Sequence, residues 1–138
     1  MVIGLLIIMA AAISNAQEIV KLGTANTVNF RGVVNDEMAQ GAALELLRLN
    51  KLRGDKDYPI YIVMDTPGGN IDSGEAFIEI AKSIPNVKTI TLFAASMGSA
   101  VVEALPGERL ILDSGILMFH RAKGQVGGQF ETGELESR

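Results

Sequence analysis

The sequence predicts an α/β fold made of βαβ crossover units in a single domain. Short apolar runs, typical of strands, alternate along the chain with segments whose apolar residues recur at helical spacing. The order strand, helix, strand, helix, strand requires crossover connections, which are almost always right-handed. The chain has 138 residues, of which 48% are hydrophobic, and this is enough for one globular core.

The first strand and helix are expected near the N-terminal end of this domain. Polar and apolar residues alternate over residues 27–34, as in a half-buried strand. Asn35 and Asp36 can cap the following helix, which we expect to run to about Leu49. Its apolar residues are spaced for burial on one face: Met38, Ala42, Leu46 and Leu49.

Two further strand and helix pairs follow. Residues 60–64 are apolar at consecutive positions, as expected for a strand covered on both faces by helices. A turn over 65–69 leads to a helix over about 72–83, and a buried strand over 87–93 leads to a helix over 96–104. The inward residues of the first of these helices are expected to be Ala76, Phe77, Ile80 and Ala81.

The C-terminal part is expected to begin with two short strands, over residues 109–113 and 116–119. The tail over 123–138 is rich in glycine and polar residues, and it takes on a helical pattern from Glu131. Because the sequence stops inside this segment with neither a cap nor a stop signal, we expect the domain over residues 17–138 to be incomplete at its C-terminus.

Residues 1–16 are predicted to be a signal peptide. The apolar run over 1–13 suits the central region of a secretory signal better than a bilayer span. Ser14 and Ala16 supply small residues for a cleavage site before Gln17. The usual preceding positive charge is missing, so an uncleaved membrane anchor and a buried element remain alternatives. Export would place the protein in the periplasm or outside the cell, and an uncleaved segment would leave it membrane-associated.

Composition argues against several classes of protein. The chain has 12 basic and 16 acidic residues, a net charge of −4, and its basic residues are scattered, which argues against nucleic acid as a partner. The absence of cysteine excludes disulfides, thiolate catalysis and cysteine metal sites. A single histidine without a nearby acidic cluster argues against zinc. We therefore expect neither a metal nor another cofactor.

Two residues indicate a serine hydrolase. Ser96 lies where an apolar strand turns into a helix, among small residues that permit a tight turn. His120, the only histidine, closes another apolar run, and a core strand there would hold it rigidly at the sheet edge. A serine hydroxyl becomes nucleophilic when a base such as neutral imidazole takes its proton. Each residue also has a plainer interpretation, Ser96 as a helix N-cap and His120 as a structural residue.

A glycine-rich turn adds a third element to this chemistry. Pro67-Gly68-Gly69 can present backbone N–H groups to a developing oxyanion, with Gly69 allowing a substrate carbonyl to approach closely. The Met97 N–H, next to Ser96, would be the second donor. Taken alone the segment is a turn, and only its combination with the serine and the histidine is specific.

In combination, these segments resemble the proteolytic subunit of Clp protease, in the ClpP/crotonase superfamily. Residues 65–74 are similar to the family's proline–diglycine loop, residues 94–99 to its nucleophile motif and residues 117–121 to its histidine strand, in the same order. The resemblance covers the chain from about Val28 onward. It implies the fold of that superfamily, with repeated β-β-α or βαβ units in a single domain, a peptide or protein substrate and assembly into a homo-oligomeric ring.

The resemblance also implies roles for individual residues. Ser96 would be the nucleophile of an acyl-enzyme mechanism, His120 the general base, and Gly69 and Met97 the oxyanion donors of a serine endopeptidase. The family's third triad residue is an aspartate well beyond the histidine, and this sequence offers no residue at that position. Asp65 and Asp113 are the nearest carboxylates in the sequence, but neither stands at that motif position, so the third catalytic residue is left unassigned.

The chain departs from the family pattern in ways that keep alternatives open. Arg121-Ala122 stands where the family usually carries Gln-Pro, and an export signal would separate the chain from an ATP-driven unfoldase, which points to an exported branch. One alternative is a serine–lysine dyad enzyme of the signal-peptide-peptidase type, with Lys82, Lys88 or Lys123 available. Another is a catalytically inactive scaffold subunit. A crotonase-like acyl-CoA enzyme would give no reason for the pairing of serine and histidine.

Overall fold

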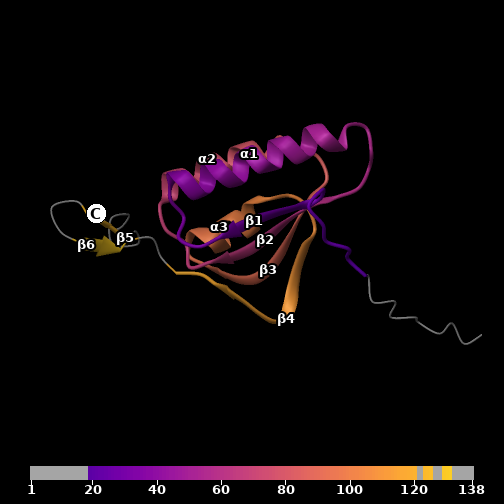
Figure 1. Ribbon diagram of the computed structural model, residues 1–138. Coiled ribbons are helices and arrows are strands. Elements are labelled where there is room, and N and C mark those ends of the chain that lie inside the picture. The colour runs from indigo at the N-terminus through magenta and orange to yellow at the C-terminus, as the bar shows by residue number, and fades with distance from the viewer. Residues whose placement is uncertain (1–18, 121–122, 126–128, 132–138) are drawn as a thin grey trace, which may run out of the picture.

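The computed structural model describes residues 19–120, 123–125 and 129–131. In this part of the chain, strands and helices alternate along the sequence (Figure 1). The strands of the main sheet are β1 (Thr27–Arg31), β2 (Ile60–Thr66), β3 (Val87–Ala95) and β4 (Arg109–Met118). The helices between them are α1 (Asp36–Arg53), α2 (Ile71–Lys82) and α3 (Met97–Ala104). The predicted signal peptide, residues 1–16, lies outside the described residues.

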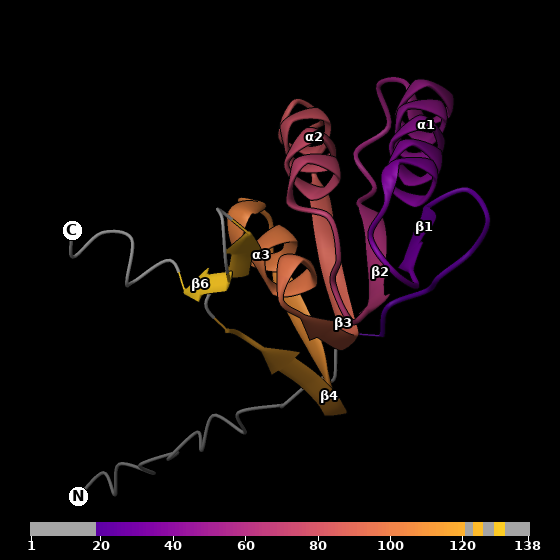
Figure 2. The same ribbon diagram turned by 90° about the vertical axis from the view of Figure 1, so that its left-hand side faces the viewer.

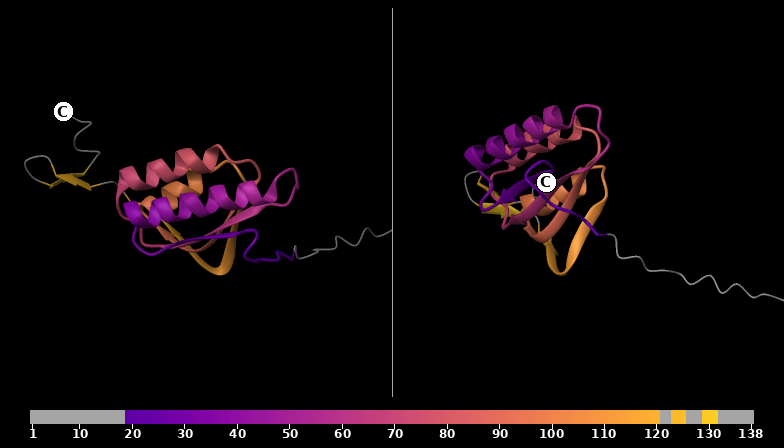
Figure 3. Two further views of the ribbon diagram at one scale, coloured as in Figure 1. Left: turned by 45° about the horizontal axis from the view of Figure 1, so that its top comes forward. Right: turned by 45° about the vertical axis from the view of Figure 1, so that its right-hand side comes forward.

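The main sheet is parallel throughout, with the strand order β1-β2-β3-β4. Because this order never reverses, right-handed crossovers bring all three helices to the same face, as Figure 2 shows. Helices α1 and α2 run side by side across the sheet (Figure 3), and α3 packs against α2. The α/β class and its βαβ units are thus confirmed. The expectation of helices on both faces of β2 is wrong for the described residues, where they cover one face only.

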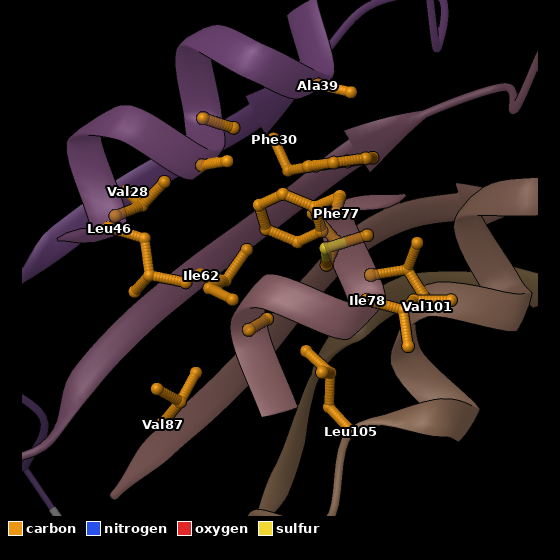
Figure 4. Packing of buried hydrophobic residues seen from close by; sticks show 14 of the residues in the cluster. Val28, Phe30, Ala39, Leu46, Ile62, Phe77, Ile78, Val87, Val101 and Leu105 are labelled. Carbon is orange, nitrogen blue, oxygen red and sulfur yellow. The ribbon is translucent and has the colours of Figure 1, made fainter. Parts of the chain in front are cut away.

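The hydrophobic core lies between the helices and this face of the sheet (Figure 4). At its centre Phe30 of β1 and Phe77 of α2 pack with their ring centroids 4.6 Å apart and are almost completely buried. Burying each such side chain contributes about 1.5–3 kcal/mol. Of the predicted inward residues of α2, Phe77 and Ala81 are buried, whereas Ala76 is exposed and Ile78 takes its place.

Helix α1 is one turn longer than predicted and ends at Arg53. The guanidinium of Arg53 is buried and donates to four acceptors: the carbonyl oxygens of Tyr58 (3.1 Å), Pro85 (2.6 Å) and Asn86 (3.2 Å), and Asn50 Oδ1 (2.8 Å). These hydrogen bonds join the last turn of α1 to the loops that precede β2 and β3. Gly54, with φ 57°, then ends the helix.

Strand β4 is a single strand where two short ones were predicted. Its register against β3 is irregular between Thr91 and Phe93, which accommodates the turn residues in the middle of the run. Its apolar side chains are largely exposed, with Ile116 54% and Met118 48% accessible. The expectation that a buried strand holds His120 is therefore wrong, since β4 forms the exposed edge of the described sheet.

The remaining described residues form a separate two-stranded antiparallel sheet, from β5 (Lys123–Gln125) and β6 (Gln129–Glu131). Glu131, where a helical pattern was expected to begin, is the last residue of β6, and the rest of that prediction lies outside the described residues. Among the helices described, none combines the length and apolar character needed to cross a membrane.

Candidate active site

Ser96 is the single residue that separates the end of β3 from the start of α3. Its backbone has φ 55° and ψ −120°, and its side chain makes no capping hydrogen bond. The interpretation of Ser96 as a simple N-cap is therefore wrong. A residue other than glycine in this conformation carries strain of about 1–3 kcal/mol, which collects at functional sites. The sharp strand–serine–helix turn is the geometry of a nucleophile elbow, which exposes the hydroxyl beyond the end of the strand.

The end of β4 fixes this turn from the side. The Ser96 N–H donates to the Met118 carbonyl at 3.0 Å, next to the β3–β4 pairing of Ala95 with Met118. The hydroxyl of Ser99 is buried between the carbonyl oxygens of Ala94 (3.0 Å) and Met118 and bonds to both. His120 follows Met118 by two residues, so these contacts bring the histidine to the end of the sheet where Ser96 lies.

The glycine loop is held by a parallel β-bridge between Gly69 and Val34. The Val34 N–H donates to the Gly68 carbonyl (2.9 Å), and the Asn70 N–H donates to the Val34 carbonyl (2.8 Å). A Cβ on Gly69, whose φ is 153°, would lie 2.3 Å from the Val34 oxygen, so only glycine fits this bridge. The bridge uses the Gly68 carbonyl and the Asn70 N–H, which flank Gly69 in the chain. The Gly69 N–H itself has no acceptor among the described residues.

The loop also packs directly on the serine turn. A Cβ on Gly68 would lie 2.8 Å from Ser96 Cβ and 2.9 Å from the Met97 nitrogen. Met97 is the first residue of α3, and within the described part of the chain its N–H likewise has no acceptor. The start of a helix carries partial positive charge. Two adjacent segments therefore offer unused N–H donors beside one serine hydroxyl, an arrangement suited to an oxyanion.

All four residues predicted for the site line one cavity of about 490 Å³: Gly69, Ser96, Met97 and His120. The structure thus brings together residues that follow the ends of three different strands, β2, β3 and β4. The cavity is also lined by residues of α2 and α3 that the sequence reasoning missed, and Glu75 is one of them. These residues recur at helical spacing directly after the glycine loop and after Ser96, and this pattern could have indicated them in the sequence.

The other acidic and basic groups considered from the sequence lie away from this cavity. Asp65 accepts from Arg31 Nε at 2.9 Å, and Asp113 is exposed on β4. Lys88 pairs with Glu108 at 2.6 Å. Lys82 is exposed and does not line the cavity, and the Lys123 side chain lies outside the described residues. In the described ranges, no group of three or more His, Asp or Glu side chains could hold a metal ion.

Known proteins are similar to this chain in sequence and in fold. Residues 11–138 match the Clp protease family. The ATP-dependent Clp protease proteolytic subunit of Streptococcus pyogenes serotype M5 (strain Manfredo) is 35% identical over 104 residues, which cover 73% of this chain and 52% of that protein. The chain therefore spans about half the length of this curated relative. A solved structure of a ClpP1 mutant from Listeria monocytogenes matches with a TM-score of 0.63 and 27% identity, over 72% of this chain and 58% of that one.

Proposed function

This chain belongs to the Clp protease family, and we propose that it acts as a serine-type peptidase through an acyl-enzyme, with Ser96 as nucleophile and His120 as general base. The observation that carries the proposal is the shared cavity. Both side chains line it, together with two backbone N–H groups that have no acceptor in the described residues.

The proposed reaction has two acyl-transfer steps. Ser96 Oγ attacks a peptide carbonyl while His120 takes its proton and then gives that proton to the leaving amine. Water, activated in turn by His120, attacks the ester and releases the acyl group. In both steps the Gly69 and Met97 N–H groups donate to the oxyanion, and removing one such donor typically costs a factor of about 10²–10³ in turnover.

The strained turn at Ser96 supports this role. The positive φ directs the side chain out of the β3 ladder, and the hydrogen bond to Met118 ties that turn to the segment carrying His120. A turn that served only to start a helix would gain from a capping hydrogen bond and would not need the strain. Preorganised positions for nucleophile, base and donors are what acyl transfer requires.

Labelling with a small fluorophosphonate probe tests the proposal. The purified protein is expected to be labelled at Ser96, as located by mass spectrometry. Ser96→Ala is expected to abolish labelling, and the matched variant Ser83→Ala, at an exposed serine after α2, is expected to label like the wild type. A folded protein that leaves Ser96 unlabelled would refute the peptidase and favour an inactive scaffold subunit.

The histidine is tested separately. His120→Ala is expected to slow labelling and peptide hydrolysis by several orders of magnitude, because the serine loses its base. Retention of most activity would instead indicate a serine–lysine dyad. The acidic partner of His120 remains unassigned in this proposal.

The assembly and location of the protein belong to the proposal as well. We propose a homo-oligomeric ring that takes peptide or protein substrates, and light scattering coupled to size-exclusion chromatography tests it. We further propose export, with the mature chain beginning at Gln17. Cell fractionation with N-terminal sequencing of the protein checks this, and an intact N-terminus in a cytosolic fraction would contradict it.

A further inference from the structure

The cavity has a feature that peptide hydrolysis does not require, a carboxylate on its wall. Glu75 lies on the same stripe of α2 as Ile71 and Ile78, at positions i, i+4 and i+7, and all three line the cavity. A stripe of α3 lines the same cavity, with Met97, Ala100 and Ala104. The cavity beyond Ser96 is therefore a slot between two helices.

Apart from Glu75, the side chains on both helix stripes are apolar. Ile78 and Met97 are buried, and the two alanines of α3 leave room for a side chain to enter between the helices. A Cβ on Gly74 would lie 2.4 Å from Met97 Cγ, so the methionine lies across α2 right beside Glu75. Within the described residues, Glu75 is the only acidic group lining the cavity, and no Lys or Arg side chain lines it.

We propose that Glu75 is a specificity-determining residue that makes the cavity prefer a Lys or Arg side chain immediately before the scissile bond. This inference rests on the proposed peptidase function. Lys and Arg have long apolar stems that pack along apolar walls while the charged end seeks a polar partner. The stem matches the stripes of α2 and α3, and the cation forms a charge-assisted hydrogen bond with the Glu75 carboxylate.

The same arrangement discriminates among other residues. An acidic side chain in the slot is repelled by Glu75, and a leucine fills the apolar part but leaves the carboxylate without a partner. Glu79, one turn further along α2, is also exposed but does not line the cavity. It is therefore a matched control, because neutralising it changes the net charge of the same helix by the same amount.

Two irreversible probes test the inference on the whole protein. Both are peptidyl diphenyl phosphonates of identical sequence except for Lys or Leu at the residue that carries the phosphonate. The measured quantity is the second-order rate constant for labelling Ser96. The wild type is expected to react at least about tenfold faster with the Lys probe, the factor typical of one hydrogen bond to a charged group. Raising the salt concentration is expected to reduce this ratio.

The variants assign the preference to one side chain. Glu75→Gln is expected to slow the Lys probe about tenfold with little change for the Leu probe, and Glu75→Lys is expected to reverse the preference. Glu79→Gln is expected to behave like the wild type. Circular dichroism of each variant checks that it is folded.

The outcomes separate this inference from the proposed function. If a small fluorophosphonate labels Ser96 but the Leu probe is preferred, or the ratio does not respond to Glu75→Gln, the specificity role is refuted while the peptidase stands. If no probe labels Ser96 in the folded protein, the peptidase proposal is refuted, and this inference, which rests on it, is refuted as well.

Discussion

Replacing Ser96 by glycine is expected to stabilise the protein while removing its proposed nucleophile. The φ of 55° and ψ of −120° at this residue cost a side chain with a Cβ about 1–3 kcal/mol. Glycine avoids this strain but gives the unfolded chain more freedom, which costs about 0.5–1 kcal/mol. The net expectation for Ser96→Gly relative to Ser96→Ala is a gain of about 1 kcal/mol in the free energy of unfolding.

Urea denaturation followed by circular dichroism measures this difference, provided that the transition is two-state. In thermal unfolding the same difference corresponds to a rise of about 3–5 °C in Tm for a chain of this size. Both variants are expected to lose fluorophosphonate labelling. Only the glycine variant is expected to combine this loss of function with a gain in stability.

A second position provides the control for this comparison. Ser83 ends α2 with φ −75°, an ordinary helical conformation. At this residue the glycine variant is expected to be less stable than the alanine variant by up to about 1 kcal/mol, so the sign reverses. A Ser96→Gly protein no more stable than Ser96→Ala would show that the turn is not strained, and the functional argument drawn from its backbone would fail.

Four further substitutions test the support of the site and of the fold around it. Gly69→Ala is expected to destabilise the fold by about 2 kcal/mol in urea denaturation and to slow labelling, because its Cβ would push the loop off Val34 and break two hydrogen bonds. Gly41→Ala, where the Cβ meets open space on α1, should instead stabilise by about 0.5–1 kcal/mol. Thr89→Val should raise the free energy of unfolding by about 1 kcal/mol, since the buried Thr89 hydroxyl has no partner among the described residues. Arg53→Met should lower Tm strongly, at a cost of about 3 kcal/mol, because the Tyr58 and Pro85 carbonyl groups lose their donor, and an unchanged Tm would contradict this.

The sequence predicted the positions of the first three strands because the first shows alternating polar and apolar residues and the next two are apolar runs bounded by turn residues. It placed the end of α1 one turn early, since Leu49 is the last residue of the apolar stripe. The extra turn depends on hydrogen bonds from Arg53 to loops more than thirty residues away, which no local pattern reveals. For β4, the apolar run indicated a strand correctly but not its burial, because hydrophobicity does not say which strand becomes the edge of the sheet.

The site could be predicted only in part, because local motifs indicate residue types but not the contacts between distant segments. The residue types at Ser96, His120 and Gly69 limit the chemistry, and the structure brings all three to one cavity. The backbone strain at Ser96 was hidden, because a serine before a helix is equally consistent with a cap. Glu75 was missed because its position on the cavity wall depends on how α2 packs against α3, a contact between helices that neither motif encodes.

The location of the cavity follows from the parallel sheet itself. Val34, the glycine loop, Ser96 and His120 each come shortly after the carboxyl end of one strand, from β1 to β4 in order. In a parallel sheet these ends all lie at the same edge, so segments distant in sequence converge there, which is where open α/β sheets bind ligands. Each segment then contacts its neighbour through backbone groups. The glycine loop forms hydrogen bonds with Val34 and packs against the turn at Ser96. The Ser96 N–H in turn donates to the Met118 carbonyl. Because the chain of contacts is made of backbone, side chains at this edge such as Glu75 can vary to change specificity without disturbing the proposed catalytic geometry.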